Sequence, residues 1–290
     1  MYRTIETILV DIPTIRPHQL SVTTMRTQTL VLVKITTTDG IVGWGEATTI
    51  GGLNYGEESP ESVKANIDTY FAPLLTSVKD LNVAQTLKLI RKNINGNRFA
   101  KCAIQTALLD IQAKRLGVPL SEVLGGRLRN SLPVLWTLAS GDTEKDIAEA
   151  RKMIELKRHN TFKLKIGARP LQQDVDHVIA IKKALGADVS VRVDVNRAWS
   201  ELECIHGIQQ LQDGGIDLIE QPCAIQNTEA LARLTLRFDV AIMADEALTG
   251  SPREYRILKN NGEAVFAVKI EKSGRMIQPC EVGKIAGFAG

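Results

Sequence analysis

The spacing of apolar residues divides the chain into two parts with different patterns. In the first part, residues 6–13, 27–37 and 40–49 have the apolar content of strands, and the turn-forming pair Asp39-Gly40 joins the last two. Apolar residues at helical spacing follow, and they predict helices near 60–76, 82–93 and 97–117. Strands first and helices afterwards are typical of a separate α+β domain, which we place at residues 1–125.

The second part, residues 126–290, alternates short apolar strands with amphipathic helices. The pattern predicts six strands, at 132–139, 161–167, 190–196, 217–222, 240–246 and 265–270. It predicts helices at 146–159, 171–186, 200–215, 227–238, 253–262 and 276–290. Such alternation indicates a parallel sheet, either a TIM-like (β/α) barrel or an open doubly wound sheet. The sequence has no GxGxxG or Walker loop opening a helix, so we favour the barrel.

Predicted strands two to six each carry a charged residue near the C-terminal end, in the order Lys165, Asp194, Glu220, Asp245 and Lys269. Neighbours in this series are one strand-plus-helix repeat apart, from 194−165 = 29 residues to 269−245 = 24 residues. In a barrel, equivalent strand ends surround the mouth where active sites of this architecture lie. Two plainer interpretations are solvated strand-end charges and an internal ion-pair network without a catalytic role.

Three carboxylates from adjacent strands, Asp194, Glu220 and Asp245, form an oxygen-rich donor set. Such a set suits a hard divalent cation, Mn²⁺ or Mg²⁺. No histidine stands at a predicted strand end, which argues against zinc.

The segment FKLKIG, residues 162–167, places Lys163 and Lys165 on one side of a strand and its apolar residues on the other. Burial and the neighbouring like charge would both favour a neutral amine at Lys165, which would then act as a base near neutral pH. Lys163 would assist electrostatically, and Lys269 would face Lys165 across the mouth. This arrangement suits proton abstraction next to a carboxylate, with an enediolate stabilised by the metal and the ammonium groups.

Composition and charge limit the classes of binding partner and the cellular location that we expect. The chain has 290 residues with 36 Lys+Arg and 33 Asp+Glu, and the net charge of +3 is too small and too well mixed to indicate nucleic acid or an anionic membrane as the main partner. Its four cysteines include no CxxC pair and are expected to be reduced core thiols. The first residues lack the apolar core of a signal peptide, and no apolar run approaches the roughly 20 residues of a membrane span. We therefore expect a soluble cytoplasmic protein.

These residues resemble the enolase superfamily, and specifically its muconate-lactonizing subgroup. The matching motifs in the second part are KLK at 163–165, DVN at 194–196, EQP at 220–222, ADE at 244–246 and VKIEKSG at 268–274. In the first part they are DIPTIRPHQLSVTTM at 11–25 and GWGEATTIGGLNYGEESPES at 43–62, and LWTLASGD follows at 135–142. The resemblance extends over essentially the whole chain.

The resemblance implies an α+β capping domain followed by a modified barrel, and the cycloisomerisation of cis,cis-muconate to muconolactone during aromatic catabolism. It implies Mn²⁺ or Mg²⁺ at Asp194, Glu220 and Asp245, with Asn196 and Glu246 supporting these ligands. Lys165 would be the acid/base, opposite Lys269, with Lys163 beside it. His18, Ile50 and Tyr55 would cover the dicarboxylate or lactone substrate, although Ile50 and Tyr55 would equally suit simple domain packing.

The sequence departs from the family at its C-terminal side. The family barrel has eight strands, whereas about six are present here, so we expect a C-terminally truncated chain that would form a homo-oligomer if full length. Within the same chemistry, chloromuconate cycloisomerase, dipeptide epimerase and o-succinylbenzoate synthase are rival assignments. A catalytically inactive fragment that retains metal or ligand binding is the non-enzymatic alternative.

Overall fold

A computed structural model describes residues 2–19, 23–54, 56–78, 82–248, 265–270 and 274 of the chain. The described residues fall into two compact units. The first contains residues 2–14, Thr27–Ser131, 269–270 and 274. The second contains residues 15–19, 23–26, 132–248 and 265–268, so the end of the first strand belongs to it.

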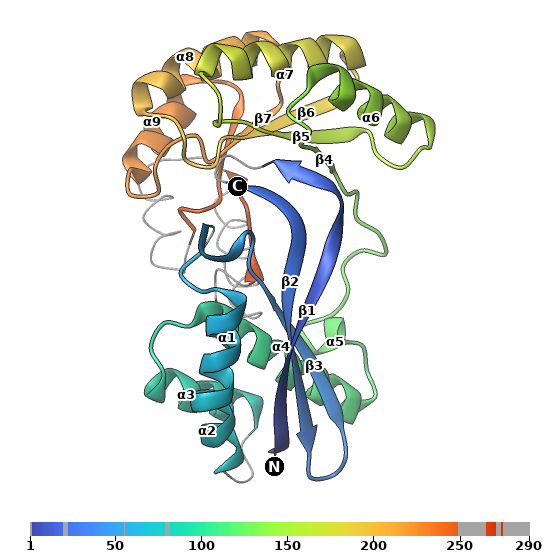
Figure 1. Cartoon of the computed structure of the whole chain (residues 1–290), viewed down its shortest axis with the longest axis vertical. Coiled ribbons are helices and arrows are strands. Elements are labelled where there is room, and N and C mark those ends of the chain that lie inside the picture. Colours follow the sequence, from blue (N-terminus) through green and yellow to red (C-terminus); the bar gives the residue numbers. More distant parts are fainter. Residues whose placement is uncertain are drawn as a thin grey trace. The chain divides into compact units, whose positions relative to one another are not determined.

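The first unit combines a three-stranded sheet with helices (Figure 1). The sheet order is β1-β2-β3, with strands at Tyr2–Gln19, Thr24–Thr37 and Val42–Thr48, and β2 pairs with β3 in antiparallel fashion. The helices are η1 (Gly52–Asn54), α1 (Pro60–Asn66), the π-helical η2 (Ile67–Phe71), α2 (Ala72–Thr76), α3 (Val83–Asn93), α4 (Arg98–Leu116) and α5 (Leu120–Val123). The helix predicted near 60–76 is thus a continuous run that contains one π turn.

Two glycines allow α4 to pack directly on β3. A Cβ atom added at Gly45 would lie 1.9 Å from the carbonyl oxygen of Ala103, and one at Gly43 would lie 2.3 Å from that of Ala107. Real Cβ atoms do not approach backbone that closely, so only glycine fits here. The helix itself ends at Gly117, whose φ of 68° is the left-handed conformation typical of a glycine C-cap.

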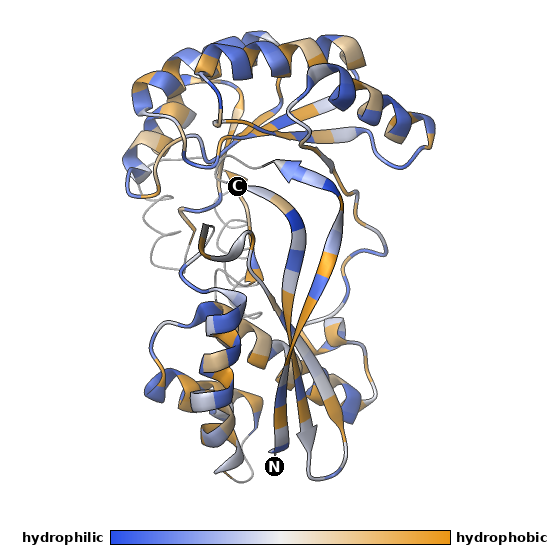
Figure 2. Ribbon diagram, in the orientation of Figure 1, coloured by the Kyte–Doolittle hydropathy of each residue, from blue (hydrophilic) through white to orange (hydrophobic). Residues whose placement is uncertain are grey.

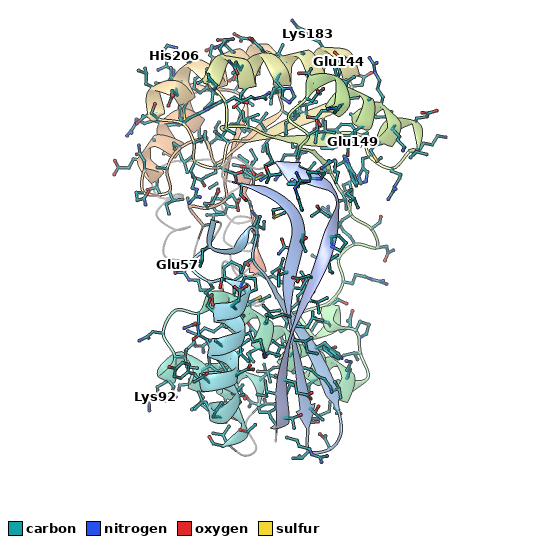
Figure 3. The ribbon with its side chains drawn as sticks, in the orientation of Figure 1. Glu57, Lys92, Glu144, Glu149, Lys183 and His206 are labelled. Atoms are coloured by element: carbon teal, nitrogen blue, oxygen red, sulfur yellow. The ribbon has the colours of Figure 1, made fainter. Side chains whose placement is uncertain are left out.

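The second unit is built on six parallel strands in the order β4-β5-β6-β7-β8-β9. Their bounds are Trp136–Leu138, Thr161–Lys165, Ser190–Asp194, Leu218–Glu220, Ala241–Ala244 and Val265–Phe266. Between them lie α6 (Thr143–Glu155), α7 (Leu171–Leu185), α8 (Glu201–Asp213) and α9 (Thr228–Arg237), which cover one face of the sheet (Figure 1). The outward sides of α6 to α8 are mostly hydrophilic (Figure 2), and Glu144 and Lys183 lie on that outer side (Figure 3).

The apolar residues of the strands explain why these helices pack there. Phe162, Leu164 and Ile166 of the β5 segment are each at most 1% exposed and belong to the core beneath the helices. Lys163 and Lys165 alternate with them and therefore occupy the opposite face of the sheet.

The predicted fold class, a capping domain followed by an incomplete TIM-like barrel, is confirmed. All six predicted strands of the second part are present, whereas the helices predicted at 253–262 and 276–290 lie outside the described residues. The predicted division at residue 125 remains a prediction.

The first strand differs from its prediction, because β1 continues beyond residue 13 to Gln19 and includes Pro13 and Pro17. β1 lies at the edge of its sheet, and an edge strand tolerates proline because it needs fewer backbone donors.

Candidate active site

The charged strand ends of the second unit lie in register along adjacent parallel strands. Lys165 pairs with Asp194 across β5 and β6, and Asp194 pairs with Glu220 across β6 and β7. Glu220 pairs with Met243 on β8, so that Asp245 stands two residues further along. The predicted alignment of these residues at one edge of the sheet is thus present, and the three carboxylates are at most 3% exposed.

Each lysine of the KLK motif is ion-paired. Lys163 Nζ lies 2.8 Å from Glu220 Oε2 and 3.7 Å from Asp194 Oδ2, and so bridges two carboxylates. Lys165 Nζ donates a short hydrogen bond to Asp194 and lies 3.3 Å from Asn196 Oδ1. Both lysines contact the Asp194 carboxylate, so each ammonium group has an opposite charge as its partner.

The electrostatics of Glu220 show that the three acids act on one another. Burial raises the pKa of Glu220, the negative charges of Asp194 and Asp245 raise it further, and Lys163 partly offsets the effect. A buried group of negative charges of this kind is stabilised by a cation. The donor chemistry, all carboxylate oxygen, fits a hard divalent metal ion.

The described residues do not form a closed metal cage. No group of three or more His, Cys, Asp or Glu side chains among them has the arrangement of a preformed metal site. The Lys163 ammonium lies between Glu220 and Asp194 and supplies positive charge there.

A second row of polar residues connects the strand ends. The backbone N–H of Asn196 donates to Asp194 Oδ1 at 3.0 Å, and its side-chain amide donates to Glu246 Oε1 at 3.1 Å. Arg197 Nε lies 3.5 Å from the same Glu246 oxygen. Asn196 has a φ of 48°, a left-handed conformation that asparagine tolerates better than most residues. These contacts place Asn196 between Asp194 and Glu246, and the supporting role predicted for Asn196 and Glu246 stays a prediction.

Gln221 is a buried residue of the site that the sequence pattern does not reveal. This side chain is fully buried, and its Oε1 accepts from the backbone N–H groups of Asp245 and Ala247, each at 3.0 Å. Its Nε2 donates to the carbonyl oxygen of Cys223 at 3.0 Å. Gln221 therefore fixes the turn that carries Asp245. The only sequence signal for Gln221 is its place between Glu220 and Pro222 in the EQP motif, where the pattern of strand-end charges points to the glutamate alone.

His18 belongs to the second unit and is influenced by the site lysines. Burial lowers the pKa of His18, and the positive charges of Arg16, Lys165 and Lys163 lower it further, while Glu149 acts in the opposite direction. These effects agree with a position of His18 near the strand-end lysines.

Three predicted residues, Ile50, Tyr55 and Lys269, do not belong to the described part of the second unit. Ile50 is half-buried just after β3 in the first unit, and Tyr55 lies outside the described residues. Lys269 is half-buried and follows β9 by three residues, but it is grouped with the first unit. Their roles stay predictions.

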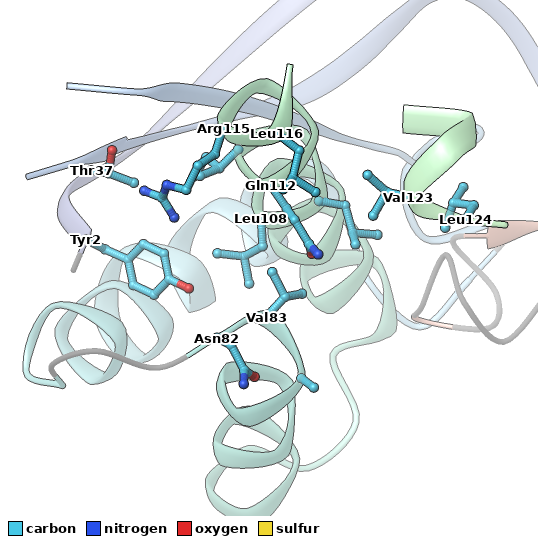
Figure 4. Close-up of a pocket in the computed structure, with 13 residues that line it drawn as sticks. Tyr2, Thr37, Asn82, Val83, Leu108, Gln112, Arg115, Leu116, Val123 and Leu124 are labelled. Carbon is cyan, nitrogen blue, oxygen red and sulfur yellow. The ribbon is translucent and has the colours of Figure 1, made fainter. Parts of the chain in front are cut away.

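The first unit contains a separate cavity of about 530 Å³ between α3, α4 and α5 (Figure 4). Its described lining is largely aliphatic, with polar side chains from Tyr2, Thr37, Asn82, Gln112 and Arg115, and it includes no carboxylate or lysine. This cavity therefore offers neither of the groups on which the strand-end site depends.

Family models match most of the chain. Residues 4–125 match "Mandelate racemase / muconate lactonizing enzyme, N-terminal domain", and residues 145–286 match "Enolase C-terminal domain-like".

Individual relatives agree with the family models. Muconate cycloisomerase 1 of Acinetobacter baylyi is 82% identical over 291 residues, which span 100% of this chain and 79% of that protein. Muconate cycloisomerase 1 of Pseudomonas putida is 51% identical, over 98% of this chain and 77% of that protein. A chloromuconate cycloisomerase of Delftia acidovorans is 42% identical, over 99% and 77% respectively.

Solved structures show the same relationship. The muconate lactonizing enzyme of Pseudomonas fluorescens, solved with muconolactone, superposes with a TM-score of 0.96 at 51% identity, covering 100% of this chain and 78% of that one. The enzyme of Pseudomonas putida superposes with a TM-score of 0.94 at 49% identity, with the same coverage. The chain therefore belongs to the mandelate racemase / muconate lactonizing enzyme family of the enolase superfamily.

Proposed function

We propose that the chain catalyses the interconversion of cis,cis-muconate and muconolactone with a divalent metal ion. The observation that carries this proposal is the array of Lys163, Lys165, Asp194 and Glu220 along adjacent strand ends, with Asp245 beside it. The choice of muconate over chloromuconate is supported by 82% identity to a muconate cycloisomerase, against 42% to a chloromuconate cycloisomerase.

Asp194, Glu220 and Asp245 would hold the metal ion. Mn²⁺ or Mg²⁺ would fit, because every donor is a carboxylate oxygen. When bound, the cation supplies positive charge that stabilises an enediolate next to the substrate carboxylate.

Lys165 is the proposed acid/base. In the lactone direction, a substrate carboxylate oxygen closes the ring, and the carbon next to the other carboxylate takes a proton from Lys165; the reverse reaction returns that proton to the amine. Asp194 and Asn196 orient this amine through their hydrogen bonds. Lys163 contributes positive charge, and Lys269 is proposed as the second amine of the site.

We further propose that His18, Ile50 and Tyr55 contact the substrate.

The described cysteines, Cys102, Cys204 and Cys223, are buried, and none is in a disulfide, which supports a reducing, cytoplasmic location. No described helix combines the length and apolarity needed to cross a membrane. A homo-oligomeric state is proposed from the family resemblance, and size measurement in solution would test it.

The decisive experiment compares the parent protein with Lys165→Ala in the presence of Mn²⁺. We expect the parent to remove the conjugated-diene absorbance of cis,cis-muconate, and we expect the variant to be slower by about 10³-fold, as for loss of a general acid/base. Lys183→Ala, which removes an exposed lysine from α7, is the matched control and should retain parental activity.

Three outcomes would contradict the proposal. Undiminished activity in Lys165→Ala would exclude this residue as the acid/base. Turnover of a dipeptide but not of muconate would favour the epimerase. A parent that binds Mn²⁺ without consuming muconate would favour the non-catalytic alternative.

A further inference from the structure

Arg16, near the end of β1, binds two other elements of the second unit. Arg16 Nε lies 2.9 Å from Glu149 Oε2 and 3.1 Å from Oε1, and its Nη2 lies 2.8 Å from Oε1. The same Nη2 donates to the carbonyl oxygen of Thr137, on β4, at 2.6 Å. One guanidinium group thus binds a helix side chain and a strand backbone together.

The carboxylate that receives Arg16 is itself held in place. The indole Nε1 of Trp136 donates to Glu149 Oε1 at 2.7 Å. The Trp136 ring lies 5.1 Å from the ring of His159, which in turn hydrogen-bonds to the carbonyl oxygen of Val134 at 2.8 Å. Glu149 lies on the side of α6 that faces the sheet, whereas Glu144 lies on the outer side (Figure 3).

The contact between Arg16 and Glu149 is also partly shielded from water. The two side chains are only 21% and 20% exposed. A two-pronged arginine–carboxylate contact on a fixed partner is directional as well as attractive. It therefore has the properties needed to fix the position of the strand that carries Arg16.

His18 depends on this attachment. Residues two apart on a strand share a face, so His18 lies on the same side of β1 as Arg16, and both are half-buried while Pro17 between them is exposed. The charges that act on His18 come from Arg16 on its own strand, Lys163 and Lys165 on β5, and Glu149 on α6. Burial and the positive charges lower the pKa of His18 below its ordinary value, so the environment of this strand favours the neutral imidazole.

We propose that Arg16 is a positioning residue for the cycloisomerase reaction: by binding Glu149 and the Thr137 carbonyl, it fixes the end of β1 within the second unit and, with it, His18, whose imidazole contacts the dicarboxylate substrate. The role in substrate binding rests on the proposed function, but the role in holding His18 does not.

The test removes the carboxylate that binds Arg16 and keeps the arginine. Glu149→Met deletes the carboxylate on α6, and the pKa of His18 is then measured by NMR titration, with the resonance assigned by its loss in His18→Asn. Loss of the negative charge alone would lower the pKa of His18, because Glu149 raises it. Release of the strand would raise the pKa, because His18 would lose its burial and its proximity to Lys165.

The direction in which the His18 pKa changes in Glu149→Met therefore tests whether the strand is released. We expect the His18 pKa to rise in Glu149→Met and in Arg16→Met, and the KM for muconate to rise about ten-fold with a smaller change in kcat, as for loss of ground-state binding. A His18 pKa that falls or stays constant in Glu149→Met would overturn the proposal, as would a parental KM in both variants.

Arg233→Met is the matched control. It breaks another two-pronged arginine–glutamate contact, with Glu201, between α9 and α8. It should leave both the His18 pKa and the KM unchanged. If the parent does not act on muconate, the proposed function fails, but the titration of His18 still reports whether Arg16 holds the strand.

Discussion

At the scale of single residues, the site is organised by the pairing of opposite charges in a buried place. Lys163 bridges Glu220 and Asp194, and Lys165 is held by Asp194 and Asn196. Two adjacent lysines in a buried strand face would be costly alone, and the carboxylates of the next two strands offset that cost. The same carboxylates, Asp194 and Glu220, are among the proposed metal ligands.

Gln221→Ala should destabilise the protein although it removes no charge. Two buried backbone N–H groups, of Asp245 and Ala247, would lose their acceptor, and we expect the free energy of unfolding to fall by about 2–4 kcal/mol. Urea denaturation measures this change. Gln172→Ala, at an exposed glutamine of α7, is the control and should shift it by less than about 0.5 kcal/mol. Equal effects of the two substitutions would show that Gln221 does not brace the turn.

Residue chemistry was only partly predictable from sequence. The positions of Asp194 and Glu220 at strand ends follow from apolar alternation, since one residue of shift would send them to the other face. The sequence could not predict the contact of Lys163 with both Asp194 and Glu220. This contact joins three strands and depends on their register. The role of Gln221 is not predictable for the same reason, since the backbone groups that it binds lie in the turn after the next strand.

At the scale of elements, the close approach of α4 and β3 shapes the first unit. Gly43 and Gly45 remove the side chains that would otherwise separate the helix from the strand. Glu58, which is 6% exposed, then accepts from the N–H groups of Phe99 and Ala100 at the beginning of α4, at 2.7 and 3.4 Å. A residue distant in sequence thereby satisfies the donors of the first helical turn.

Gly45→Ala should separate these two elements. The added Cβ would meet the backbone of Ala103, which cannot move aside as a flexible side chain would, and we expect a loss of about 3 kcal/mol in the free energy of unfolding. Glu46→Ala, on the exposed face of the same strand, should change it far less. Parental stability in Gly45→Ala, measured by urea denaturation, would contradict the close packing.

Glu58→Gln should change the pH dependence of stability. Burial raises the pKa of Glu58 in the folded state, so its favourable contribution is complete below the ordinary glutamate value of about 4.3 and is lost as the pH rises through the raised value. Glutamine keeps an acceptor but does not ionise. The variant should therefore gain stability relative to the parent between pH 4 and pH 8, as measured by urea denaturation at both pH values. A relative gain by the parent over that range would refute this assignment.

At the scale of the whole molecule, the chain carries a near-balanced charge of +3, yet it concentrates acids and lysines at one edge of the parallel sheet. Helices cover one face of that sheet, and the apolar strand residues on that face form the core. The charged residues at the strand ends are not part of that core. The architecture thereby separates stability from function.

Added Mn²⁺ should stabilise the folded protein. At 100 times its dissociation constant a ligand of the folded state contributes about 2.7 kcal/mol, which raises the thermal midpoint, and a chelator should reverse the rise. Asp245→Asn should abolish this response, whereas Asp188→Asn, at an exposed residue, should preserve it. An identical Mn²⁺ response in Asp245→Asn would remove that carboxylate from the proposed ligand set.

The sequence by itself determined the two-part organisation, the six parallel strands and the alignment of acids and lysines at their ends. Those features follow from local periodicity, since strands and helices of period 2 and 3.6 must bury their apolar faces. The tertiary structure alone decided that Lys163 shares two carboxylates, that Gln221 braces Asp245, and that β1 continues to carry Arg16 onto Glu149. These contacts join residues far apart in the chain, and their geometry arises only when separate elements pack together.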